Sequence, residues 1–229
     1  MEGQWGLDDP DAEPTPAQAA KRRAGEAVRR LIDQLAGTDA SDEVLVAMAE
    51  DLEAVVETFR GAPRAAYTGF AEAANAPDAA QMGGTLLDRS PVMGLANPIA
   101  PPMQLRMSAG RVEGLVTFGA AYEGPPGCVH GGWIAAAFDE VLGASQSLSG
   151  KAGMTAYLHI DYRSPTPLHR ALRFEGELDR VEGRKIFTQG RVVDGEVLCA
   201  EAHALFIAFD AARFAELRTR RDAGEDAEA

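Results

Sequence analysis

The chain has 229 residues, 46% of them hydrophobic, which is enough for one domain with a substantial core and an appendage. Its formal net charge of −13 argues against non-specific binding to nucleic acid, because phosphates would be repelled. Two cysteines far apart in the chain favour a reducing compartment over a disulfide framework. The acidic start lacks a signal-peptide pattern and no apolar run approaches the ~18 residues of a membrane span, so we expect a cytoplasmic protein.

Two amphipathic helices are expected in an N-terminal extension and linker that we assign to residues 1–88. Residues 17–35 carry apolar side chains on one face, and residues 42–60 carry a longer apolar stripe at steps of three and four. Such a stripe usually packs on a core and less often marks an interaction helix or coiled coil. Residues 1–16 are acidic and proline-rich and are expected to be disordered, and residues 61–88 read as a linker. The stripe of the second helix comprises Leu45, Met48, Leu52, Val55, Val56 and Phe59.

From residue 104 onward the pattern predicts one long helix over residues 133–148 and an antiparallel meander, within a domain assigned to residues 89–209. Asp194-Gly195 is a strong hairpin signal. A short helix and a charged tail are expected over residues 210–229. The expected strands are residues 104–107, 112–118, 154–163, 172–180, 185–193 and 196–209; within 154–163, alternation sets Met154, Ala156, Leu158, Ile160 and Tyr162 on the face opposite Thr155, Tyr157, His159, Asp161 and Arg163.

The most informative motif is a loop rich in glycine and proline that ends in His130-Gly131-Gly132 where the long helix starts. Glycines let a ligand approach the backbone closely, and the first amides of a helix have no partner inside it. These amides also carry the positive end of the helix dipole, so they suit an oxygen that is gaining negative charge. Asp139, two turns further on, is a candidate base or nucleophile. Together these groups indicate acyl transfer or hydrolysis.

The spacing of the motif predicts a shared site. Gly131 and Asp139 would lie roughly 12 Å apart on one helix at 1.5 Å rise per residue. Contacts to one carbonyl group require about 3 Å, so both cannot act on the same carbonyl from one chain. Two helices packed in opposite directions in a two-fold dimer would bring the groups together. We therefore expect a homodimer or a dimer of dimers.

These motifs resemble the hotdog-fold acyl-CoA thioesterases, in particular the phenylacetyl-CoA thioesterase-like group and the animal thioesterase superfamily members close to it. The resemblance covers roughly residues 90–208. It implies an α+β hotdog fold, in which an antiparallel sheet wraps around one long helix, with the N-terminal helices as an extension. The matching segments are Gly-Pro-Pro-Gly at 124–127, His-Gly-Gly at 130–132, Asp139, Thr155-Ala156-Tyr157-Leu158 and Tyr162-Arg163-Ser164-Pro165-Thr166-Pro167-Leu168.

The resemblance implies an acyl-CoA substrate, no cofactor and roles for each motif residue. The Gly131 amide, with Gly132 as a second donor, would polarise the thioester carbonyl. Asp139 of the partner subunit would activate water, or attack directly to give a mixed anhydride. Thr155 falls where the group carries a hydroxyl that orients the water; a packing role is the alternative. His130 would shape the loop and the binding site, and proton transfer by its imidazole is the less favoured role.

Other chemistry-bearing residues have plainer interpretations. Glu140 is rotated about 100° from Asp139 and is expected to form a salt bridge. Cys128 has no histidine placed as a partner, which disfavours a cysteine nucleophile. Cations near the substrate entrance would have to bind the CoA phosphates, with solvated turn charges as the competing interpretation; the candidates are Arg163, Arg184 and Lys185. The remaining histidines lack metal-ligand spacing, so no metal site is expected; they are His159, His169 and His203.

Two further function classes stay open. One is a non-catalytic acyl-CoA sensor or interaction protein, whose N-terminal helices would carry the signal. The other is a hotdog hydratase or dehydratase, which needs an acid–base pair on a different spacing. One departure matters: the phenylacetyl-CoA group often carries an asparagine about six residues before the motif histidine, and this chain has Gly124 there. The carbonyl-polarising role of that asparagine is therefore absent or taken by another group.

Overall fold

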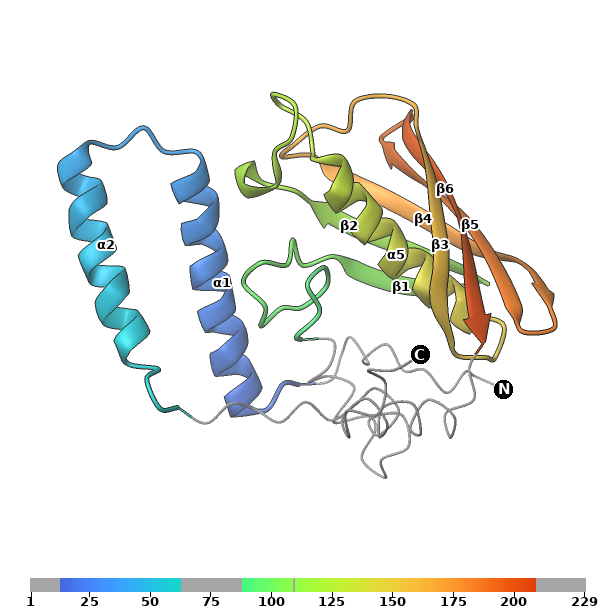
Figure 1. The fold of residues 1–229 in the computed structure, drawn as a ribbon, viewed down its shortest axis with the longest axis horizontal. Coiled ribbons are helices and arrows are strands. Elements are labelled where there is room, and N and C mark those ends of the chain that lie inside the picture. The colour runs from blue at the N-terminus through green and yellow to red at the C-terminus, as the bar shows by residue number, and fades with distance from the viewer. Residues whose placement is uncertain (1–12, 63–87, 109, 209–229) are drawn as a thin grey trace, which may run out of the picture.

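A six-stranded antiparallel sheet and one central helix form the body of the molecule (Figure 1). The computed structural model describes residues 13–62, 88–108 and 110–208. The strand order is β1-β2-β4-β5-β6-β3, and each neighbouring pair is antiparallel. This confirms the predicted α+β hotdog fold. The strands are β1 (Gln104–Ser108), β2 (Arg111–Thr117), β3 (Gly153–Tyr162), β4 (Ala171–Glu182), β5 (Lys185–Asp194) and β6 (Val197–Ala208).

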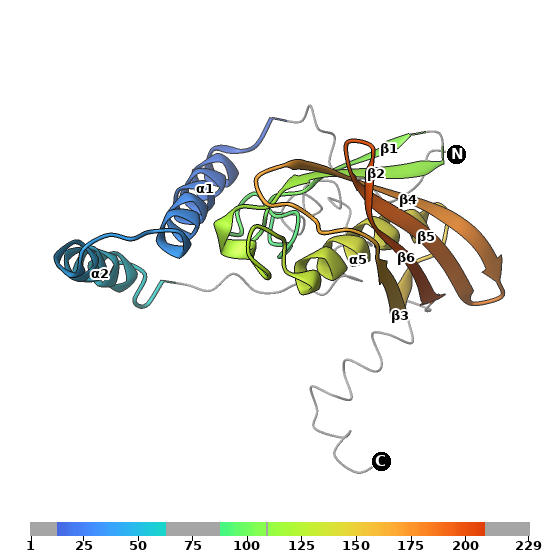
Figure 2. The same ribbon diagram turned by 90° about the horizontal axis from the view of Figure 1, so that it is seen from above.

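The central helix α5 (Gly131–Ser147) lies across one face of the sheet and makes the core (Figures 1 and 2). Phe138 is fully buried and meets Phe174 of β4 edge-on, with ring centroids 5.0 Å apart. Burying such a side chain stabilises the fold by roughly 1.5–3 kcal/mol. Gly176 of β4 lets the helix approach closely, because a Cβ there would come within 2.5 Å of Ser145 Oγ.

Element boundaries agree with the expected ones to within two or three residues. The turns at Gly183 and Gly195 have φ of 61° and 58°, a conformation that favours glycine. The predicted disorder before residue 13, most of the linker and the C-terminal helix lie outside the described residues.

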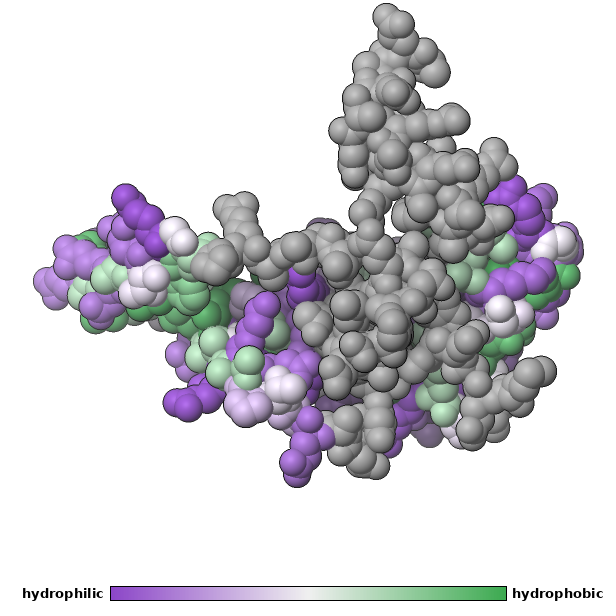
Figure 3. All heavy atoms as spheres, turned by 90° about the horizontal axis from the view of Figure 1, so that it is seen from below, coloured by the Kyte–Doolittle hydropathy of each residue, from purple (hydrophilic) through white to green (hydrophobic). Residues whose placement is uncertain are grey.

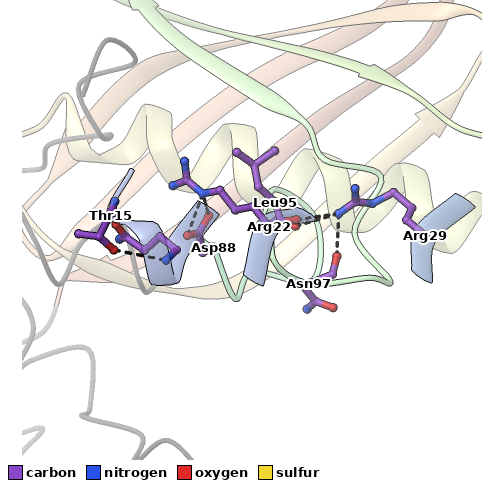
Figure 4. A network of polar contacts seen from close by, with 8 residues as sticks. Thr15, Arg22, Arg29, Asp88, Leu95 and Asn97 are labelled. Carbon is purple, nitrogen blue, oxygen red and sulfur yellow. Dashed lines mark hydrogen bonds and ion pairs between the residues drawn. The ribbon is translucent and has the colours of Figure 1, made fainter. Parts of the chain in front are cut away.

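Helix α1 (Pro16–Ala36) docks on the segment 88–103 that leads into β1. Its N-terminus is closed by a capping box between Thr15 and Gln18. Arg22 of α1 binds both carboxylate oxygens of the buried Asp88, at 2.8 and 3.0 Å (Figure 4). Gly25 is the buried residue of α1, and a Cβ there would lie 2.9 Å from Ala96 O. The helix therefore fits the segment by shape as well as by charge.

The guanidinium group of Arg29 makes most of the hydrogen bonds between α1 and the segment 88–103. Arg29 donates from Nε to Ala100 O at 2.7 Å, and from one terminal nitrogen to the carbonyls of Gly94, Leu95 and Asn97 at 3.0–3.3 Å. Figure 4 shows the bonds to Leu95 and Asn97. The side chain is 12% exposed. A planar fork with several donors suits this cage of carbonyls, and the single point charge of lysine would not.

Replacing Arg29 by methionine is expected to lower the free energy of unfolding by about 2–4 kcal/mol, because buried carbonyls lose their donor while the apolar stem is kept. Urea denaturation followed by circular dichroism measures the change. Arg30→Met is the matched control, since this neighbouring side chain is exposed. Equal stability of the two variants would contradict this account of the docking.

Helix α2 (Asp42–Glu57) projects beyond α1, which lies between it and the sheet in both ribbon views (Figures 1 and 2). None of its residues is buried, and Val55, Val56 and Phe59 are 54%, 67% and 69% exposed. Apolar colouring is visible among polar side chains on these projecting helices (Figure 3). The expectation that this stripe packs on the core is therefore wrong. None of the described helices is long and apolar enough to cross a membrane.

Candidate active site

The loop before α5 holds the helix start in place. Gly127 N–H donates to Glu123 Oε1 at 2.6 Å, and Gly127 adopts a φ of 74° that favours glycine. His130 is the N-cap residue, and its Nδ1 accepts the Gly132 N–H at 3.0 Å. The imidazole thus satisfies one of the unpaired amides of the first turn. The Gly132 amide is consequently not free, which corrects the expectation that it is a second donor to the substrate carbonyl.

Gly131 is the first residue of α5 and keeps a free amide. Within the described part of the chain its N–H makes no hydrogen bond, and the residue is half-buried. Its carbonyl accepts the Tyr162 hydroxyl at 2.8 Å. Burial raises the pKa of Tyr162, so this hydroxyl stays protonated and a donor at neutral pH. The free amide stands at the positive end of the helix dipole.

Asp139 and Thr155 are brought together, as the motif predicts. Thr155 Oγ1 donates to Asp139 Oδ1 at 2.8 Å, and both residues are exposed. A register shift between Thr155 and Tyr157 leaves Ala156 as an extra residue in β3, a β-bulge. The bulge places Thr155 on the helix-facing side, which Leu158 also faces. The predicted strict alternation places Thr155 and Leu158 on opposite faces of β3, and the bulge makes this prediction wrong.

Glu140 follows Asp139 in the chain, but its carboxylate contacts Ser90 and not Thr155. Its Oε1 accepts the Ser90 hydroxyl at 2.7 Å, and the same Ser90 oxygen accepts the amides of Val92 and Met93 at 3.1 Å. Burial, and to a smaller extent the nearby Asp139 charge, raises the pKa of Glu140, and the Ser90 bond opposes this. In the described part of the chain Glu140 forms no ion pair, so the predicted salt bridge is wrong. The residue ties α5 to the segment 88–103.

The open side of the site faces the edge of the sheet. Gly131 and Asp139 both lie on α5, which places them roughly 12 Å apart along the helix. β3 is the edge strand beside them, and among the described strands it pairs with β6 alone. Its large side chains Met154, Tyr157 and Tyr162 are about half exposed. One chain therefore presents an amide and a carboxylate at separate points along the outer edge of β3.

The three candidate cations do not form one cluster within a chain. Arg163 follows the end of β3 and pairs with Glu201 at 3.0 Å and with Asp161 at 3.5 Å. Arg184 donates to Ala208 O at 3.0 Å, and Lys185 pairs with Ile207 of β6, level with the start of β3. The two groups are thus separated by the length of β3, roughly 30 Å at 3.3 Å per residue.

The two cysteines take no part in the contacts described so far; Cys128 lies in the loop before α5 and Cys199 in β6. Cys128 is half-buried and Cys199 is buried, where burial raises the pKa of its thiol. No group of three metal-ligating side chains is found in residues 13–62, 88–108 and 110–208. A hollow of about 310 Å³ lies on the outer face of the sheet, opposite α5, and contains no part of the Gly131–Asp139 motif. It is lined by Arg111, Glu175, Gly176, Glu177, Gln189, Gly190, Arg191, Glu201 and His203.

Comparisons with known proteins place this arrangement in a family. The model of the thioesterase superfamily matches residues 126–200. A crystal structure described as a thioesterase superfamily protein is 36% identical, covers 82% of this chain and 94% of its own, and has a TM-score of 0.70. The chain belongs to the thioesterase superfamily. Because the match to that superfamily member covers 82% of the chain, it extends beyond residues 89–209.

Curated thioesterase relatives match a shorter stretch. The chain is 43% identical over 91 residues to acyl-coenzyme A thioesterase THEM4 of Xenopus laevis, covering 39% of this chain and 41% of that protein. It is 42% identical over 94 residues to the THEM4 protein of Bos taurus, covering 40% and 38%. The chain thus spans about two fifths of the length of these curated relatives.

Proposed function

We propose that the protein is an acyl-CoA thioesterase that hydrolyses the thioester to a free acid and CoA. The observation that carries this proposal is the combination of a free Gly131 amide at a helix N-terminus with Asp139 held by the Thr155 hydroxyl. The acyl-CoA substrate is supported by the likeness to the THEM4 relatives, which are named acyl-coenzyme A thioesterases. Membership of the thioesterase superfamily supports the reaction class.

In the proposed mechanism the thioester carbonyl accepts the Gly131 N–H, and Asp139 takes a proton from an attacking water. The hydroxide adds to the carbonyl carbon, and the oxyanion that forms is stabilised by the amide, a contribution of roughly 3–4 kcal/mol for such a donor. The tetrahedral intermediate then expels the CoA thiolate, which receives the proton from Asp139. The Thr155 hydroxyl holds the carboxylate and lies beside the place of the water.

Two chains are needed for each site in this proposal. Because Gly131 and Asp139 of one chain are roughly 12 Å apart, Asp139 must meet the Gly131 of another copy. The unpaired edge of β3 is the surface that supports such pairing, since an antiparallel arrangement of two β3 strands reverses one α5 against the other. The same reversal brings Arg163 of one subunit toward Arg184 of the partner subunit, which supports a joint site for CoA phosphates.

Because Nδ1 of His130 accepts the Gly132 N–H, the neutral imidazole carries its proton on Nε2 and does not act as a base while this bond is kept. The hydratase or dehydratase alternative therefore lacks a histidine base in this arrangement.

A panel of acyl-CoA esters, from acetyl through long-chain and phenylacetyl, tests the proposal by thiol release. At least one ester is expected to be hydrolysed with a kcat/KM above about 10⁴ M⁻¹s⁻¹, the lower end of ordinary enzymes. Binding of acyl-CoA without release of thiol across the panel would instead support the non-catalytic sensor.

A further inference from the structure

The two glycines that begin α5 are joined by a peptide that is hydrogen-bonded at both ends. Its carbonyl, from Gly131, accepts the Tyr162 hydroxyl at 2.8 Å, and its N–H, from Gly132, donates to His130 Nδ1 at 3.0 Å. A peptide between two glycines turns over easily, since neither residue has a Cβ to restrict φ and ψ. Turning it over would break both bonds.

We propose that Tyr162 is a positioning residue for thioester hydrolysis: its hydroxyl holds the carbonyl of Gly131 and thereby holds the residue whose N–H, in the preceding peptide, faces the substrate carbonyl. This inference rests on the proposed function, in which that amide binds the oxyanion. An oxyanion donor acts through preorganisation, because a donor that must reorient during the reaction loses much of its contribution. Fixing the carbonyl of Gly131 fixes the residue that carries the donor.

The register of β3 against β6 places Tyr162 beside the start of α5. Tyr162 is the last residue of β3 and pairs with the buried Ala200 of β6, which places its ring on the side of α5. The residue remains 53% exposed. Its hydroxyl is thus at the open edge of the sheet, beside the candidate donor.

The two hydrogen bonds that hold the Gly131–Gly132 peptide, from Tyr162 and to His130, are called the clamp. They also explain why both positions are glycine. A Cβ at residue 131 would lie 3.1 Å from the Tyr162 hydroxyl and 3.4 Å from the ring carbon that bears it. A Cβ at residue 132 would lie 3.1 Å from His130 Nδ1. Each glycine is therefore matched to the side chain that holds the peptide.

Tyr162→Phe tests the inference because it removes the hydroxyl and keeps the ring. We expect kcat to fall about 10- to 100-fold with KM changed less than about threefold, since misplacing a catalytic group costs rate more than binding. The matched control is Tyr157→Phe on the same strand, a half-exposed tyrosine with no side-chain hydrogen bond in the described part of the chain. This control is expected to keep the wild-type kcat. A Tyr162→Phe enzyme with unchanged kcat would overturn the inference.

A second measurement does not depend on activity. In protein labelled with ¹⁵N-glycine, the exchange rate of the Gly132 amide with solvent is expected to rise at least about tenfold in Tyr162→Phe and to stay unchanged in Tyr157→Phe, because local opening of the peptide exposes the amide. Unchanged exchange in Tyr162→Phe would refute the clamp. A wild-type protein that hydrolyses no acyl-CoA would refute the proposed function alone, and the exchange measurement would still decide the clamp.

Discussion

Asp139→Asn is expected to lower kcat/KM for the best acyl-CoA substrate by about a hundredfold or more while the fold is retained. The amide cannot take a proton from water, which removes the general base. The shape of the site survives, since the asparagine oxygen can still accept the Thr155 hydroxyl in place of the carboxylate. Thiol release under single-substrate conditions measures the loss, and circular dichroism checks the fold.

Glu140→Gln is the matched control for this prediction. It removes the adjacent carboxylate, and the new amide oxygen can still accept the Ser90 hydroxyl. Its activity is expected to stay within about threefold of the wild type, and Cys128→Ser is expected to do the same. An Asp139→Asn enzyme that keeps more than about a third of the activity would remove Asp139 from the mechanism, and an inactive but folded Cys128→Ser enzyme would favour a cysteine nucleophile.

Mixing two inactive variants is expected to restore activity to about half per dimer. One variant is Asp139→Asn and the other is Gly131→Val, whose side chain would crowd the Tyr162 hydroxyl and cover the amide. In a mixed dimer one site inherits both defects and the other inherits neither. The recovery follows from the proposed shared site, in which the amide and the carboxylate come from different chains. Activity is measured after subunit exchange and compared with each variant alone.

Size measurement must first establish that both variants are folded oligomers and that their subunits exchange. Affinity tags of two kinds then isolate the mixed dimer. If the isolated mixed dimer is inactive, each site is built within one chain and the shared-site proposal fails. If either variant alone is active, the corresponding group has no part in the reaction.

The sequence predicts the fold well because local signals and topology agree. Alternating strands, the Asp194-Gly195 turn and the uninterrupted helix after Gly132 each depend on neighbouring residues. The candidate site could be located for the same reason, since Gly131 and Asp139 lie on one helix and their spacing can be counted.

The features of the fold and site that the sequence did not predict depend on contacts between segments that are distant in the chain. The bulge that turns Thr155 toward Asp139 is a property of the register between β3 and β6, and no composition signal marks it. Tyr162 matches the family motif, but its bond to Gly131 follows from tertiary packing. The exposed stripe of α2 shows the converse, because an amphipathic pattern identifies a face and does not identify what covers it.

The segment 88–103 contacts both the first helix, α1, and the central helix, α5. Arg22 holds Asp88 from α1, and Ser90, two residues later, holds Glu140 beside Asp139 on α5. The first helix is thus linked to the helix that carries Asp139 through two side-chain contacts, one at each end of the short stretch from Asp88 to Ser90. Substitutions in α1 that break its docking would therefore also loosen the segment that holds Glu140. Recombination that exchanges the first helix between relatives would therefore have to carry the segment 88–103 with it.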